Sequence, residues 1–136
     1  DGARELDRKT KTGMPLHWII DSRTRLVAVT AEGDFTRTDL EAYLRAVDGG
    51  GAVAWRKLFD ARHGRPAMGR DDMLAVSVLF RGYHQRGPVG ALALVVTDAQ
   101  AERVSRALGV LASADRSMRI FDDLDKARRW IESVPA

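Results

Sequence analysis

The fold of this chain is decided by one stretch, Val89-Gly90-Ala91-Leu92-Ala93-Leu94-Val95-Val96, and by the Thr97-Asp98-Ala99-Gln100 that follows it. The first part is apolar without alternation, which is typical of a strand buried on both faces of a parallel sheet. The second part has a hydroxyl residue followed three positions later by a glutamine, the pattern of a capping box at a helix start. A buried strand that leads directly into a helix predicts an α/β fold.

On both sides of this stretch, short apolar runs alternate with helical patterns. Strands are expected at residues 16–20, 25–31, 53–60, 89–96 and 118–121, and helices at residues 36–47, 71–85, 97–112 and 122–134. The first two strands form a hairpin, and right-handed crossovers join the others. We therefore predict a single α/β domain with a five-stranded mixed sheet, in which an N-terminal antiparallel edge strand precedes four β-α turns in a right-handed superhelix. Residues 1–13 are polar and are predicted to form a tail, so the domain is expected to span residues 14–136.

If the superhelix advances in one direction, right-handed crossovers place all helices on one face of the sheet. The other face then carries apolar residues that need a cover, which favours self-association. In the last helix, Ala127, Trp130 and Ile131 share one stripe. We expect the Trp130 indole to pack in the core between that helix and the sheet.

Composition and charge exclude several classes of protein. The 136 residues hold 22 Lys and Arg against 19 Asp and Glu, and the basic residues are interleaved with the acidic ones, so no nucleic-acid partner is expected. No apolar run approaches the ~20 residues of a membrane span, and residues 1–5 lack the apolar core of a signal peptide. These features predict a cytoplasmic protein. With no cysteine, and three histidines at no metal-binding spacing, we expect no metal and no cofactor.

Three segments carry a resemblance to a known family: Gly33-Asp34-Phe35-Thr36, Lys57-Leu58-Phe59-Asp60-Ala61-Arg62, and the final strand and helix from Arg119 to Ile131. Together with the element order they resemble the SpoIIAA-like proteins, relatives of the STAS domains and, more distantly, of SEC14-type lipid-binding domains. The resemblance covers residues 14–134. It implies the SpoIIAA-like superhelix and the binding of protein partners or small apolar ligands.

The resemblance does not extend to the regulatory switch of the anti-sigma-factor antagonists. Those proteins carry a phosphorylatable serine at the start of the helix after the third strand. The corresponding stretch here, from Asp60 to Asp71, contains no Ser or Thr. We therefore expect no phosphorylation of a hydroxyl group at this position.

The helix expected at residues 71–85 is apolar on more than one face, whereas a surface helix ordinarily shows a single stripe. Part of it should therefore be covered by something other than its own sheet. A second copy in a homodimer, another protein, a small apolar ligand or the N-terminal tail would each serve, and so would a position deep in the monomer. The residues predicted to bind a ligand or partner are Met73, Val76, Leu79, Phe80 and Tyr83.

A polar group follows the third strand, at the sheet edge where α/β proteins bind ligands. An aspartate can orient a histidine for acid–base catalysis, and Asp60 with His63 is the best such pair in the chain. No nucleophile lies nearby, and the alternative is an ion pair between Asp60 and Arg62 beside a loop histidine.

The sequence therefore favours a non-enzymatic regulatory or protein-interaction module of bacterial type, with no metal and no prosthetic group expected. Two alternatives stay open. One is a carrier or sensor of a small apolar, lipid-like ligand, and the other is an enzyme that uses Asp60 and His63.

Overall fold

The computed structural model describes residues 15–103 and 118–135. The strands are β1 (Leu16–Asp21), β2 (Leu26–Phe35), β3 (Arg56–Pro66), β4 (Leu92–Val95) and β5 (Met118–Phe121). The helices are α2 (Arg37–Gly49), α3 (Arg70–Arg86) and α5 (Leu124–Ser133), and residues 98–103 are also helical. The polar tail, residues 1–13, and most of the helix expected at residues 97–112 lie outside the described residues.

The five strands form one sheet in the order β1-β2-β3-β4-β5. Strand β1 pairs antiparallel with β2, and the remaining neighbours pair in parallel. The predicted mixed sheet with an antiparallel N-terminal edge strand is confirmed, and β4 is an interior strand. All four residues of β4 are buried because other parts of the chain cover both of its faces. This explains the uninterrupted apolar sequence.

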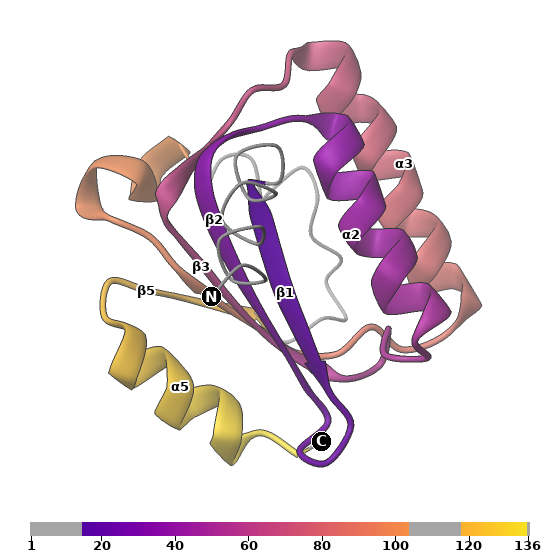
Figure 1. Cartoon of the computed structure of the whole chain (residues 1–136), viewed down its shortest axis with the longest axis vertical. Coiled ribbons are helices and arrows are strands. Elements are labelled where there is room, and N and C mark those ends of the chain that lie inside the picture. The colour runs from indigo at the N-terminus through magenta and orange to yellow at the C-terminus, as the bar shows by residue number, and fades with distance from the viewer. Residues whose placement is uncertain (1–14, 104–117, 136) are drawn as a thin grey trace, which may run out of the picture.

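Helices cover both faces of the sheet (Figure 1). Val27 and Val29 pack in the core with α2 and α3, whereas Leu58 and Ala93 pack with Ile131 of α5. The expectation that all helices share one face is therefore wrong for α5. A crossover must reach the next parallel strand, which fixes its face. In contrast, α5 follows the last strand, so no crossover constrains it, and its apolar stripe covers the opposite face.

The last helix buries Ala127 and Ile131 completely, while Trp130 is only partly buried at the border of this core. The Trp130 ring lies 5.8 Å from the Phe121 ring, and the Arg119 guanidinium lies over both rings. The indole thus packs on strand β5 near solvent, and Ile131 takes the central place that the stripe suggested for Trp130.

Strand β3 continues to Pro66, six residues beyond its predicted end. Its extension pairs with the end of β2, which runs to Phe35, and one extra residue in β3 forms a bulge between the pairs Thr30–Asp60 and Glu32–His63. Gly64 permits this pairing because a Cβ there would press against the Cβ of Ala31. Arg62 and His63 therefore lie on a strand instead of in the predicted loop.

The two ends of the domain are tied together by Arg56, the first residue of β3. One guanidinium nitrogen donates to the carbonyl oxygens of Ile131, Glu132 and Val134 at the end of α5. The other donates to the carbonyl oxygen of Thr24, in the β1–β2 turn. Figure 1 shows this turn beside the C-terminal end of the chain.

Candidate functional site

Helix α3 lies farther from the sheet than α2 does. The backbone of α2 approaches β1 and β2 closely, whereas among the described elements α3 approaches mainly α2. A cavity of about 430 Å³ lies between α3, α2 and the strands β3 and β4. This volume lies within the range of small-molecule sites, roughly 300–1,000 Å³.

The described lining of the cavity is mainly apolar and comes chiefly from α2, α3, β3 and β4, with further residues from β2, the helical residues 98–103 and the neighbouring loops. Phe59 of β3 and Leu94 of β4 contribute from the sheet, and Tyr43 and Leu44 contribute from α2. The Tyr43 and Phe59 rings pack edge to face at 6.2 Å, a favourable arrangement for two aromatic rings. Basic and amide groups line it as well, namely Lys57, Arg65, Gln100 and Arg103.

The Lys57 side chain holds the loop between α2 and β3. It is 5% exposed, and its Nζ donates to the carbonyl oxygens of Val53 and Trp55, both at 2.6 Å, and of Ala52 at 3.4 Å. A buried ammonium requires such partners because its charge has left water. Lys57 was not among the predicted site residues, although the alternation of side chains along a strand places it on the same side of β3 as Phe59.

The residues predicted to bind a ligand or partner fall into two groups. Met73, Phe80 and Tyr83 line the cavity. Val76 is fully buried in the core and Leu79 packs against that core. The outward side of α3 instead carries Leu74, 53% exposed, and Val78, 60% exposed.

The polar group predicted after the third strand is an ion pair. The Arg62 side chain donates from Nε to Asp60 Oδ1 at 2.9 Å and from Nη2 to Oδ2 at 2.8 Å, and its backbone N–H also donates to Oδ1 at 3.2 Å. These hydrogen bonds hold the pKa of Asp60 below its ordinary value, against the opposing effect of burial. Both carboxylate oxygens are thus engaged by Arg62. Alternation along β3 turns Asp60 toward the face opposite Phe59, away from the cavity.

This pair predicts a pH-dependent stability. The lowered pKa means that Asp60 stabilises the fold above its unfolded pKa of about 3.9, and that this stabilisation is lost as pH falls through the lower folded value. We expect the difference in unfolding free energy between wild type and Asp60→Asn to shrink as pH falls below about 4. Urea unfolding from pH 7 to pH 3 measures it. In an Arg62→Gln background, Asp60→Asn should change the unfolding free energy less, because the partner that lowers the pKa of Asp60 is gone. A wild-type difference that stays constant from pH 7 to pH 3 would contradict the assignment.

Within residues 15–103 and 118–135, no group of three or more histidine, aspartate or glutamate side chains is arranged to hold a metal ion. In the same residues, no helix has the length and hydropathy needed to cross a membrane.

Comparison with known proteins agrees with this architecture. The family model described as SpoIIAA-like matches residues 26–132. An uncharacterised protein with a SpoIIAA-like fold from Shewanella loihica PV-4 is similar in structure, with a TM-score of 0.62 and 15% identity, over 85% of this chain and 93% of that one. An anti-sigma factor antagonist from Mycobacterium paratuberculosis has a TM-score of 0.52 and 13% identity over the same shares. No curated protein matches the chain. Because the family model covers most of its length, the chain belongs to the SpoIIAA-like family.

Proposed function

We propose that this protein binds a small apolar ligand in the cavity between α3 and the sheet, as a non-enzymatic carrier or sensor. The observation that supports the proposal is the cavity of about 430 Å³ with its aliphatic and aromatic lining. Protein interiors ordinarily leave few voids larger than a water molecule. A largely apolar cavity with a few polar groups is the usual form of a small-molecule site.

A series of 1-alkanols from hexanol to dodecanol tests the proposal by isothermal titration calorimetry. Each buried CH₂ contributes about 0.8 kcal/mol, so affinity should rise up to roughly fourfold per carbon until the cavity is full. Absence of saturable binding, or affinity independent of chain length, would count against the proposal.

A pair of tryptophan variants on α3 localises the binding. Met73 lines the cavity, whereas the next residue, Leu74, is exposed. Met73→Trp should fill the cavity and weaken alkanol binding at least ~10-fold, because its ring occupies the volume that the ligand needs. Leu74→Trp, the matched control, should bind as wild type does. Circular dichroism checks that both variants fold, and equal binding by both would place the ligand elsewhere.

A protein-interaction module is the second candidate, supported by the outward face of α3. Leu74 and Val78 lie one turn apart and are both more than half exposed. A second copy of the chain that covered this face would form a homodimer, and a stable interface buries about 1,200 Å² or more. Sedimentation velocity at rising protein concentration tests this, and a single monomeric species throughout would reject the homodimer.

A further inference from the structure

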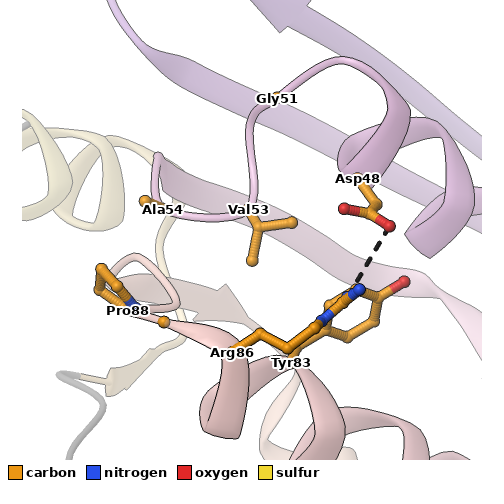
Figure 2. A pocket seen from close by; sticks show the side chains of 8 residues that line it. Asp48, Gly51, Val53, Ala54, Tyr83, Arg86 and Pro88 are labelled. Atoms are coloured by element: carbon orange, nitrogen blue, oxygen red, sulfur yellow. Dashed lines mark ion pairs between the residues drawn. The ribbon is translucent and has the colours of Figure 1, made fainter.

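A second, smaller compartment adjoins the apolar cavity. It has a volume of about 270 Å³ and lies where α2 and α3 end, as Figure 2 shows. Val53 and Tyr83 line both the compartment and the cavity. These two side chains therefore form part of the boundary between the two spaces, and one of them, Val53, lies on a loop.

The described lining of the compartment includes one cation, Arg86. The Arg86 guanidinium carbon lies 4.6 Å from the centre of the Tyr83 ring, a cation–π contact. Arg86 Nη2 also lies 3.7 Å from Asp48 Oδ2, with the two side chains 63% and 48% exposed. Ion pairs this long and this exposed contribute little to stability. A ligand carboxylate could thus replace Asp48 while Tyr83 keeps the guanidinium in position.

We propose that the apolar cavity takes an aliphatic monocarboxylate whose carboxylate binds Arg86 and whose hydrocarbon tail passes Val53 and Tyr83 into the cavity. This inference rests on the proposed function. The planar guanidinium matches a carboxylate with two parallel hydrogen bonds. The exposed compartment leaves the charged head partly hydrated, and the apolar cavity removes the tail from water. Arg86 lies in the last turn of α3, where its charge offsets the partial negative charge of the helix end.

The opposite end of the cavity fits this head group less well. Arg65 lines the cavity there, but its side chain is engaged with Asp34, at 2.9 Å from Nε and 2.7 Å from Nη2. A carboxylate at Arg65 would have to break two short contacts, whereas at Arg86 it replaces one long contact. The excess of basic residues, a net charge of +3, also favours an anionic ligand over a cationic one.

Binding of dodecanoate and of 1-dodecanol, which share a tail length, separates the head group from the tail. We expect wild type to bind dodecanoate at least ~10-fold more tightly, and Arg86→Gln to remove that advantage without changing the affinity for dodecanol. Asp48→Asn should strengthen dodecanoate binding several-fold, because it removes the competing carboxylate. Arg81→Gln is the matched control: Arg81 is exposed on the same helix and is not in the described lining of either space, so this variant should bind dodecanoate as wild type does. Arg65→Gln tests the other end of the cavity.

The outcomes distinguish this inference from the proposed function. If neither compound binds, both fail. If dodecanol binds and Met73→Trp blocks it, but Arg86→Gln leaves the preference for dodecanoate unchanged, the cavity is a binding site and the head-group assignment is wrong. Loss of the preference in Arg65→Gln would place the head at the other end of the cavity. Tighter binding of dodecylamine than of dodecanoate would also overturn the assignment.

Discussion

Replacing Gly90 with alanine is expected to lower the free energy of unfolding by roughly 4 kcal/mol or more, among the largest effects of single substitutions. A Cβ on Gly90 would overlap the backbone carbonyl group of Trp55 and crowd the carbonyl oxygen of Ala54. The Gly90 N–H also donates to the Val53 carbonyl oxygen at 3.0 Å, so the two segments are held together. Backbone cannot move aside as a flexible side chain can, and the clash must distort the loop that borders the cavity.

Gly82→Ala is the matched control for this substitution. Gly82 lies within α3, and a Cβ there would meet nothing within 4 Å. Because glycine inside a helix costs about 0.5–1 kcal/mol relative to alanine, Gly82→Ala should stabilise the protein slightly. Urea unfolding of the two variants should therefore give changes of opposite sign. A Gly90→Ala variant within about 1 kcal/mol of wild type would contradict the close backbone contact.

Lys57→Met should lower the free energy of unfolding by about 2–4 kcal/mol. Methionine keeps much of the side-chain volume but removes the ammonium that donates to the Ala52, Val53 and Trp55 carbonyl oxygens. The Ala52 and Val53 oxygens also accept backbone N–H groups, so they are not left without a donor, which limits the loss. Removing a buried charge also recovers part of its desolvation cost.

Lys126→Met is the control for the general loss of a positive charge. Lys126 is exposed on α5, so this variant should change stability by no more than about 0.5 kcal/mol. Guanidinium chloride unfolding compares the two. Equal changes in both variants would show that the hydrogen bonds of Lys57 add nothing to the stability of the loop.

The sheet could be predicted because its signals are local. An uninterrupted apolar run identified β4, and the capping pattern that follows it marked the start of a helix, where Thr97 and Gln100 cap each other as predicted. The extension of β3 could not be predicted, because its residues from Arg62 to Pro66 are polar or turn-forming. They pair with β2 near solvent, where no apolar alternation is required.

The candidate site was predictable only in part. The apolar residues of α3 cover more than one face because the helix packs with α2 as well as over the sheet, and Met73, Phe80 and Tyr83 line the cavity. That they bind a ligand or partner stays a prediction. Periodicity alone does not say where α2 lies relative to α3, so Val76 was grouped with them although it is core. Asp48 and Arg86 could not be predicted as site residues, because each is an ordinary charged residue near the end of a helix. Only the packing of α2 beside α3 brings them together.

The Arg56 guanidinium has a consequence for how the domain opens. Its hydrogen bonds join the β1–β2 turn to the end of α5, segments more than 100 residues apart along the chain. Neither segment can fray without releasing bonds held by the other, so their backbone amides should exchange with solvent as one cooperative unit. Helix α3, with its weaker attachment to the sheet, falls outside that unit. Local unfolding that admits a ligand can therefore begin at α3 while the two ends of the chain stay closed.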